Sequence, residues 1–319
     1  MITAIAILGP TASGKSRLAI DLARRSGGEI LSIDSRQAYR RLDIGTAKPS
    51  AEDRRAIPHH LIDILDLQEK NNAESFANMA HMAAREVASH GRLPIFVGGS
   101  GLYFRAITRG FFNIKLDPVE RTAFAQSLGG APDGLLFRRL EVIDPESARR
   151  IHRNDRHRIT RALEVYSLTG TPLSTHMRNQ RHDPQRQEVR FVTLGLDIPR
   201  AELHRNIHER ARMMFERGWV EETMKLLAEG ADPDWPGMKT LGYPEVIALI
   251  EGKSTFAATV TRVVELTRQY AKRQITWFKK ETDVTWLRGD APGILESAFT
   301  LVRTSTGTDG TDGNGGNGG

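Results

Sequence analysis

A short segment near the start of the chain combines glycines, a lysine and a hydroxyl in a spacing suited to holding phosphate. It consists of Gly9, Pro10, Thr11, Ala12, Ser13, Gly14, Lys15 and Ser16. The segment fits the pattern G-x-x-x-x-G-K-[ST], and it lies between an apolar run typical of a strand and an amphipathic stretch typical of a helix. Gly9 and Gly14 permit backbone angles that turn several N–H groups toward one anion, and the helix adds the positive end of its dipole. Lys15 supplies a mobile charge, and the hydroxyl of Ser16 is a ligand for Mg²⁺. These residues predict a site for a di- or triphosphate, without indicating which one.

A carboxylate follows the next predicted strand. Residues 29–33 form a buried run that ends at Asp34. Active groups of open parallel sheets gather at the carboxyl ends of strands, so we expect Asp34 close to the phosphate segment. A carboxylate there can accept a proton from a nucleophile or hold Mg²⁺ through water. An Asp-Ser pair at such a junction also serves as a helix N-cap, and both roles are compatible.

A second glycine-rich turn follows the predicted strand at residues 92–97. It reads Gly98, Gly99, Ser100 and Gly101, without the spacing of a dinucleotide-binding turn and without a lysine. Two explanations stay open: a close approach of substrate to the backbone with Ser100 as its hydrogen-bond partner, or a tight turn alone. Phosphate-loop hydrolases often end this strand in an Asp that organises magnesium, and here that role would fall to Asp34. The adjacent His59 and His60 project differently, which favours a structural role over metal binding.

The elements that must position these residues alternate between strand and helix up to about residue 115. From 116 to 188 the pattern changes to short helices, and from 189 to 303 the strand-and-helix alternation resumes with a long basic helix at 256–281. We therefore predict an α/β fold: a phosphate-loop-like parallel sheet core (1–115 and 189–303) flanked by helices, with an inserted all-helical domain (116–188). Residues 304–319 are rich in Thr, Asp, Asn and Gly, a composition that predicts a disordered tail.

Charge favours a polyanionic partner. The 319 residues carry 45 Lys and Arg against 39 Asp and Glu, a net charge of +6. Six arginines and two histidines lie within residues 149–161, a density that suits phosphate backbones, although a solvated face is the plainer alternative. Tyr270 and Trp277, among the cations of the long helix, are expected either in the core or against nucleotides.

Other functions are excluded or disfavoured by composition. With no cysteine, the chain cannot form disulfides or thiolate metal sites. No apolar run approaches the ~20 residues of a membrane span, and the first residues form a core strand rather than a signal peptide. We expect a cytoplasmic, monomeric protein without a membrane partner.

Six motifs in a fixed order make the chain resemble the tRNA dimethylallyltransferases. They are GPTASGKS at 9–16, IDSRQ at 33–37, DIGTAKP at 43–49, VGGSGLY at 97–103, RITRALEVY at 158–166 and TRQYAKRQITWF at 267–278. The resemblance covers nearly the whole chain apart from the tail. Ser100 stands where the family often has threonine, and His157 where glutamine is common.

The resemblance implies transfer of a dimethylallyl group from dimethylallyl diphosphate, with Mg²⁺, to the exocyclic amine of the adenosine on the 3′ side of the anticodon in tRNA. The phosphate loop, residues 9–16, would hold the leaving diphosphate, with Ser16 on the metal. Lys15, Arg210, Ser100 and Asp34 would be catalytic, Asp34 by orienting the amine and accepting its proton.

The target base would be flipped out of the anticodon loop and read in a pocket. The residues that the resemblance places on the RNA are Asp34, Ser35, Arg36, Gln37, Ser100, Arg121, His157, Arg158, Ile159, Thr160, Arg161, Lys239, Thr240, Leu241, Gly242, Tyr243, Arg268, Gln269, Lys272, Arg273 and Gln274.

Two other functions compete. A small-molecule or nucleotide kinase explains the phosphate loop but leaves the arginine-rich insertion without a role. A non-catalytic RNA-binding protein with a regulatory nucleotide site predicts that Lys15→Ala leaves RNA affinity intact.

Overall fold

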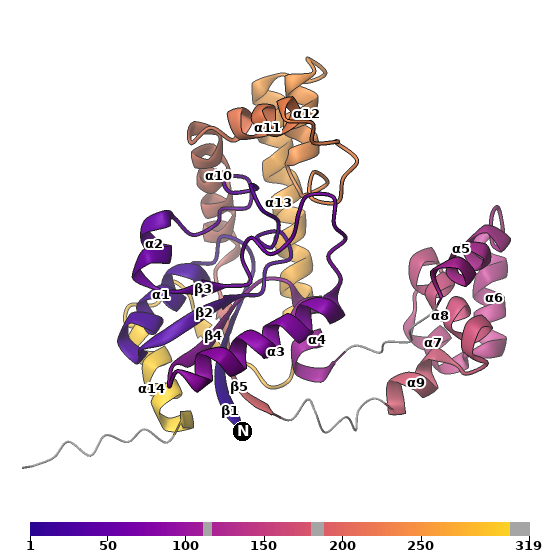
Figure 1. Cartoon of the computed structure of the whole chain (residues 1–319), viewed down its shortest axis with the longest axis horizontal. Coiled ribbons are helices and arrows are strands. Elements are labelled where there is room, and N and C mark those ends of the chain that lie inside the picture. The colour runs from indigo at the N-terminus through magenta and orange to yellow at the C-terminus, as the bar shows by residue number, and fades with distance from the viewer. Residues whose placement is uncertain (111–116, 180–187, 307–319) are drawn as a thin grey trace, which may run out of the picture. The chain divides into compact units, whose positions relative to one another are not determined.

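The computed structural model describes residues 1–110, 117–179 and 188–306 (Figure 1). The chain divides into two compact units: a core unit formed by Met1–Thr108 and Glu188–Gly319, and a helical unit formed by Arg109–Gln187. The helical unit is thus one continuous segment inserted between the two parts of the core unit.

The core unit contains a six-stranded parallel sheet. Its strands are β1 (Ile2–Leu8), β2 (Gly28–Ser32), β3 (His59–His60), β4 (Leu93–Gly98), β5 (Val189–Asp197) and β6 (Thr285–Arg288), and their order is β3-β2-β4-β1-β5-β6. The central strand β1 pairs in register with β4, as Ile5 with Ile95, and with β5, as Ile5 with Val192. Its run of apolar residues is explained by burial on both faces, which is typical of parallel sheets. The α/β prediction is confirmed.

Helices cover both faces of this sheet. On one face, α1 (Lys15–Ser26) and α14 (Ile294–Thr306) pack over the side chains of Ile5 and Ile7. On the other, α3 (Ala73–Ser89) and α4 (Gly101–Arg109) pack over an aromatic cluster in which Phe96 lies edge-on to Phe191, with ring centroids 5.2 Å apart. The alternation of side chains along each strand supplies both cores.

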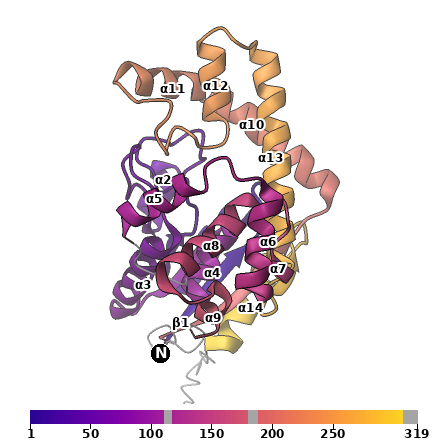
Figure 2. The same ribbon diagram turned by 90° about the vertical axis from the view of Figure 1, so that its right-hand side faces the viewer.

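Four helices extend the core unit beyond the carboxyl ends of the strands. Helix α10 (Arg200–Glu216) packs beside α13 (Phe256–Phe278), and α11 (Trp219–Ala228) and α12 (Tyr243–Ile250) lie at the far end of this pair in both views (Figures 1 and 2). Their own hydrophobic cluster centres on the buried Trp219 and Tyr243 and also takes in Tyr39 and Leu42, which follow β2. The connection between β2 and β3 ends with the short helix α2 (Ala51–Ala56). Its N-cap residue Ser50 forms a capping box with Asp53.

The helical unit consists of α5 (Pro118–Ser127), α6 (Asp133–Ile143), α7 (Pro145–Arg150), α8 (Arg156–Thr169) and α9 (Leu173–Asn179). Leu136, Leu140 and Ile159 are fully buried at its centre. Asp144 is buried too, and its carboxylate accepts hydrogen bonds from the backbone N–H groups of Ser147 at 3.0 Å and Ser174 at 2.9 Å, joining α7 to α9. The unit therefore has a core of its own.

Two expected boundaries differ from the structure. Helix α14 continues through Thr306, so residues 304–306 are helical and the prediction of a disordered tail from 304 is wrong for them. The buried Val302 and Ala298 anchor this last helix on the sheet. The rest of the predicted tail, 307–319, lies outside the described residues. The compact helical unit begins at Arg109, where α4 ends, rather than at 116.

Candidate active site

The phosphate loop is a tight turn between β1 and α1. Gly14 caps α1 with φ +82°, and Ala12 also has a positive φ of +62°. The side chain of Lys15 is buried, and its Nζ donates a hydrogen bond to the carbonyl of Pro10 at 3.0 Å. Ser16 lies at the start of α1 with its side chain exposed to the pocket described below. The loop thus presents an ammonium, a hydroxyl and a helix N-terminus to the same space.

The second glycine-rich turn, at residues 98–101, packs against helix α13. A Cβ on Gly99 would collide with the side-chain amide of Gln274, and one on Gly101 with the indole of Trp277. A Cβ on Gly98 would strike the backbone of Ile33. Neither the approach of a substrate nor the tight turn is needed to explain these glycines, because close contacts within the protein already require them.

Gln274 joins the two loops. Its Oε1 accepts a hydrogen bond from the backbone N–H of Thr11 at 2.8 Å, and its Nε2 donates to the carbonyl of Gly99 at 2.9 Å. The side chain is 5% exposed. One buried amide therefore fixes the distance between the phosphate loop and the turn after β4.

Asp34 lies beyond the end of β2, as expected from the order of the strands. Its Oδ1 accepts a hydrogen bond from the backbone N–H of Arg36 at 2.9 Å, which stabilises a turn rather than capping a helix. The N–H of Ser35 donates to the Oγ of Ser100 at 3.3 Å, so the ends of β2 and β4 are linked. Asp34 also lines the pocket described next.

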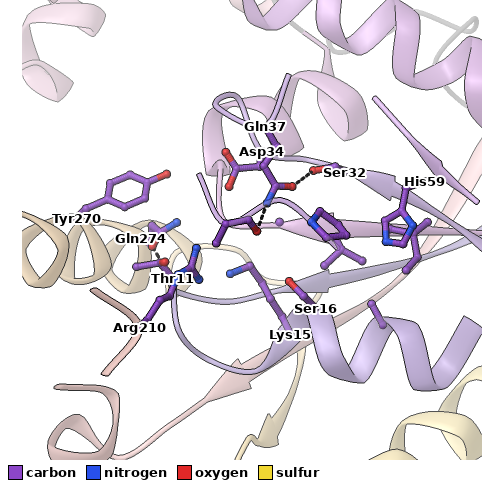
Figure 3. Close-up of a pocket in the computed structure, with 16 residues that line it drawn as sticks. Thr11, Lys15, Ser16, Ser32, Asp34, Gln37, His59, Arg210, Tyr270 and Gln274 are labelled. Atoms are coloured by element: carbon purple, nitrogen blue, oxygen red, sulfur yellow. Dashed lines mark hydrogen bonds between the residues drawn. The ribbon is translucent and has the colours of Figure 1, made fainter. Parts of the chain in front are cut away.

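A pocket runs between these segments (Figure 3). Figure 3 shows Asp34 and Gln37 on one side of it and Lys15, Ser16 and Arg210 on the other. Arg210 comes from α10, and Tyr270 and Gln274 come from α13. The other lining residues are Thr11, Ala19, Ile30, Ser32, Ala47, Pro49, His59, Val97 and Gly98. The structure thus brings Lys15, Ser16, Asp34 and Arg210 together from three places in the sequence.

The charges in the pocket are unbalanced. The pKa of Lys15 is lowered from 10.5 to about 8, chiefly by burial and then by the nearby Arg210, while Asp34 opposes the shift. Burial also lowers the pKa of Arg210, again against the influence of Asp34. The buried Lys15 and the half-buried Arg210 therefore share one carboxylate, an arrangement that a bound anion would relieve.

Three of the polar lining residues are not among the predicted site residues, although Tyr270 was expected either in the core or against nucleotides. Tyr270 has its pKa raised to about 12, chiefly by burial and then by Asp34, so its hydroxyl stays protonated and is hydrogen-bonded to Ser100. Ser32 donates to the Oε1 of Gln37 at 2.9 Å. His59 has its pKa lowered, mainly by burial, and its Nδ1 lies 2.7 Å from the carbonyl of Ile57. Tyr270 had a usable signal, since it is four residues before Gln274 on one helix face.

The RNA-facing residues expected in the core unit fall into two groups. On α13, Arg268, Gln269, Lys272 and Arg273 are exposed, whereas Gln274 is buried. In the segment 239–243, Lys239 is exposed and 3.0 Å from Asp234, Leu241 is half-buried, and Thr240, Gly242 and Tyr243 are buried. Gly242 has φ +95° and packs against Trp219, which explains the burial of this segment. Ser35, Gln37 and the exposed Arg36 follow β2.

The helical unit places the remaining expected residues around the start of α8. Glu164 is buried there between Arg121, whose Nε is 2.9 Å away, and Arg161. Burial alone raises the pKa of Glu164, but the hydrogen bonds with Arg161 and Arg121 outweigh it and hold the pKa below its ordinary value. His157 and Arg158 are exposed, and Thr160 is half-buried. Ile159 is fully buried in the unit's core, so it packs there and offers no surface to RNA.

The pocket offers few ligands for a metal. Among the described residues, no group of three or more His, Cys, Asp or Glu side chains is placed to hold a metal ion. The hydroxyl of Ser16 and the carboxylate of Asp34 do line one pocket. This fits Mg²⁺, which keeps several waters and takes one or two protein ligands together with phosphate oxygens.

None of the helices that the structure describes has both the length and the apolar character needed to span a membrane.

Fold and site together define a phosphate-loop α/β protein with an inserted helical unit. The family model described as IPP transferase matches residues 37–281, and the chain belongs to this family.

Similar proteins cover nearly the whole chain. A tRNA dimethylallyltransferase 1 from Citrifermentans bemidjiense is 45% identical over 287 residues, 90% of this chain and 92% of that protein. A tRNA dimethylallyltransferase from Halorhodospira halophila is 44% identical over 281 residues, 88% of this chain and 90% of that protein.

Two solved structures are similar as well. The full-length tRNA isopentenylpyrophosphate transferase of Bacillus halodurans has a TM-score of 0.69 and 35% identity, covering 96% of this chain and 99% of that one. A eukaryotic dimethylallyltransferase acting on tRNA has a TM-score of 0.76 and 27% identity, covering 96% and 78%.

Proposed function

We propose that this protein transfers a dimethylallyl group from dimethylallyl diphosphate to the N6 amine of the adenosine 3′-adjacent to the anticodon in tRNA, releasing diphosphate. Membership of the IPP transferase family and the names of its relatives support prenylation of tRNA over a kinase activity. The observation that carries the proposal is the pocket in which the buried Lys15 and the half-buried Arg210 face Asp34. Because the substrate is tRNA, we expect the protein in the cytoplasm.

The cationic side of the pocket suits a departing diphosphate. As the bond between the allylic carbon and the diphosphate oxygen breaks, negative charge grows on the leaving group. Lys15 and Arg210 are fixed before the reaction, so they stabilise that charge without reorganising. Mg²⁺, held at Ser16 with help from the diphosphate itself, would neutralise further charge. The N–H groups of the phosphate loop complete the binding site.

The acidic side of the pocket suits the adenosine amine. The carbon–nitrogen bond forms as the carbon–oxygen bond breaks, and the amine must then lose a proton. Asp34 is the carboxylate in position to orient the amine and accept that proton. Ser100, held by the N–H of Ser35 and by Tyr270, lies beside Asp34 and is placed to hydrogen-bond the base.

The RNA would be held by exposed cations and read in the pocket. Arg268, Lys272 and Arg273 on α13, with Lys239, supply phosphate contacts on the core unit. His157 and Arg158 supply them on the helical unit. Phosphate contacts provide affinity, and the pocket provides specificity for the flipped base.

The test is to incubate the purified protein with Mg²⁺, dimethylallyl diphosphate and an anticodon stem-loop containing adjacent adenosines, and to weigh the RNA by mass spectrometry. We expect the RNA to gain one dimethylallyl unit, on a single adenosine, and Lys15→Ala to abolish the gain. RNA of unchanged mass, with phosphate transfer from ATP to small acceptors instead, would support the kinase. RNA binding that persists in Lys15→Ala with no product from either protein would support a non-catalytic role.

A further inference from the structure

A carboxylate far from the phosphate loop holds one wall of the pocket. Glu222 on α11 accepts hydrogen bonds from three consecutive backbone N–H groups, those of Asp43 at 2.9 Å, Ile44 at 2.8 Å and Gly45 at 3.4 Å. It also accepts one from the hydroxyl of Tyr243 on α12, at 2.7 Å. Four donors converge on one side chain, which is the pattern of an anion held in a backbone nest.

Packing reinforces these hydrogen bonds. A Cβ on Gly45 would collide with the indole of Trp219 and the ring of Tyr243, so the backbone at 45 lies directly on the aromatic core of α11 and α12. Trp219 and Tyr243 meet edge to face, with centroids 5.5 Å apart, and both are fully buried. The contact leaves little room for this backbone to move toward the helices.

The other side of the same segment forms part of the pocket. Ala47 and Pro49 line it directly. The carbonyls of Thr46 and Ala47 accept hydrogen bonds from the Nε2 of Gln37 at 3.3 and 3.1 Å, and the Oε1 of Gln37 accepts from Ser32 at 2.9 Å. Gln37 therefore depends on the segment 43–49 for its orientation beside Asp34.

The far end of the segment has a separate anchor. The buried Nζ of Lys48 donates to the carbonyl of Tyr39 at 2.7 Å and to the carboxylates of Asp43 at 2.8 Å and Asp63 at 2.5 Å. Lys48 holds the far end of the segment to Tyr39 and Asp63, and Glu222 holds the first residues of the segment to α11. Loss of Glu222 would free the N–H groups of residues 43–45 from α11, while Lys48 would still hold the side chain of Asp43.

We propose that Glu222 is a positioning residue for prenyl transfer: it fixes residues 43–45 and, through them, sets Gln37 and the pocket wall opposite the phosphate loop. The proposal rests on the proposed function. Among the described residues, Lys15, Ser16 and Arg210 take part in none of the hydrogen bonds that hold residues 43–49 and Gln37. The two sides of the pocket are therefore held by separate sets of hydrogen bonds.

Glu222→Gln is the direct test, because an amide keeps the shape but offers one acceptor oxygen and turns an NH₂ group toward N–H donors. We expect the single-turnover rate of prenyl transfer to fall about tenfold or more, as for loss of hydrogen bonds to a charged group. The dissociation constant and stoichiometry of inorganic pyrophosphate with Mg²⁺ should stay within twofold of wild type. The matched control is Glu221→Gln, which removes the neighbouring, exposed carboxylate of α11.

A second variant and a second readout guard against misfolding and against failure of the proposed function. Tyr243→Phe removes one of the four donors and should lower the rate less than Glu222→Gln. Hydrogen exchange measured by mass spectrometry should show lost protection at residues 43–45 in Glu222→Gln and unchanged protection in α1.

The outcomes separate as follows. A rate equal to that of Glu221→Gln, or pyrophosphate affinity or stoichiometry that falls as much as the rate, would overturn the positioning role. If Glu222→Gln does not fold, an unchanged rate and unchanged exchange at 43–45 in Tyr243→Phe would overturn it. If the wild-type protein makes no prenylated RNA, the proposed function fails by itself, and the positioning of 43–45 is decided by hydrogen exchange alone.

Discussion

At the scale of single residues, the pocket is defined by two cations beside one carboxylate. Lys15 is buried and Arg210 is half-buried, and burial lowers the pKa of both side chains against the influence of Asp34. An anion that binds beside these cations offsets the free-energy cost of burying them, and a ligand with several negative charges offsets more of it. Burial of the cations therefore favours a multiply charged ligand.

Lys15 makes anion binding depend on pH. In the free protein its pKa is about 8, so the ammonium is charged below that pH and loses its proton above it. A bound diphosphate stabilises the ammonium and moves the pKa back toward 10.5, so binding takes up a proton between about pH 8 and 10. We expect the affinity for inorganic pyrophosphate to fall as pH rises through 8, by up to about tenfold per pH unit.

Isothermal titration calorimetry from pH 7 to 9.5 in buffers of different ionisation enthalpy measures both the affinity and the proton uptake. Pyrophosphate titrates by itself, and Lys15→Ala is therefore the reference protein. The pKa assigned to Lys15 is contradicted if the two proteins show the same pH dependence.

Asp34 is predicted to act on the rate rather than on affinity for RNA. Asp34→Ala removes the acceptor for the amine proton, and turnover should fall by roughly 10² to 10⁴. Binding of the anticodon stem-loop, measured by fluorescence anisotropy, should stay within a few-fold. Asp283→Ala, at an exposed carboxylate that does not line the pocket, serves as the control. Turnover equal to that of the control would rule out Asp34 as the base.

At the scale of elements, α13 gathers the site more than any strand does. Tyr270 reaches Ser100, Gln274 spans the two glycine-rich loops, and Trp277 packs on Gly101 beneath the guanidinium of Arg105, 4.7 Å from the ring centroid. These residues are four and three positions apart and so share one helix face. The neighbouring face carries the exposed cations proposed to hold RNA.

Gln274 tests this role of α13. In Gln274→Glu the carboxylate still accepts from Thr11 but cannot donate to Gly99, whose buried carbonyl then faces negative charge. An unsatisfied buried polar group costs about 1–3 kcal/mol, so pyrophosphate affinity should fall roughly 5- to 150-fold. Gln269→Glu makes the same change of charge at an exposed position of the helix and should leave pyrophosphate affinity nearly unchanged. Equal losses in the two variants would indicate a general electrostatic effect instead.

The sequence predicts the elements of this site better than their contacts. Local patterns predict the phosphate loop, the strand that ends before Asp34 and the parallel sheet. The spacing of the loop and the apolar runs of strands buried on both faces can each be recognised in a few consecutive residues. The roles of Gln274 and Glu222 cannot, since the backbone groups to which they hydrogen-bond are 175 or more residues away in the chain. The burial of Ile159 and Tyr243 was missed for the same reason: a motif assigns a residue to a site without saying which face of its helix is packed.

At the scale of the whole molecule, basic residues serve two distinct purposes. The helical unit uses Arg121 and Arg161 to neutralise the buried Glu164, and these cations stabilise its fold. Arg158, by contrast, is exposed and 3.3 Å from the exposed side of Asp155, the N-cap of α8. The total of 45 Lys and Arg residues therefore overstates the cations available to a polyanion.

This distinction predicts different results for two similar variants. Arg158→Gln should weaken binding of the stem-loop and reduce the slope of log affinity against log salt by up to about 0.7–0.9, one phosphate contact, with little change in thermal stability. Arg161→Gln should also lower the melting temperature, because Glu164 loses a partner while staying buried. Anisotropy at several salt concentrations and thermal melts measure the two effects. If Arg158→Gln leaves the salt slope unchanged, its side chain belongs to a solvated face.

The position of the helical unit within the chain has a consequence for synthesis. The central strand β1 is made first, but its partner β5 begins at Val189, after all of Arg109–Gln187. At about 5–20 residues per second, roughly 10–40 s pass between the two strands on the ribosome. During that interval the helical unit, which buries a core of its own, can fold completely while the β5 side of β1 is still unpaired. A nascent chain of this protein therefore carries an unpaired apolar strand edge for longer than a chain whose paired strands are close in sequence.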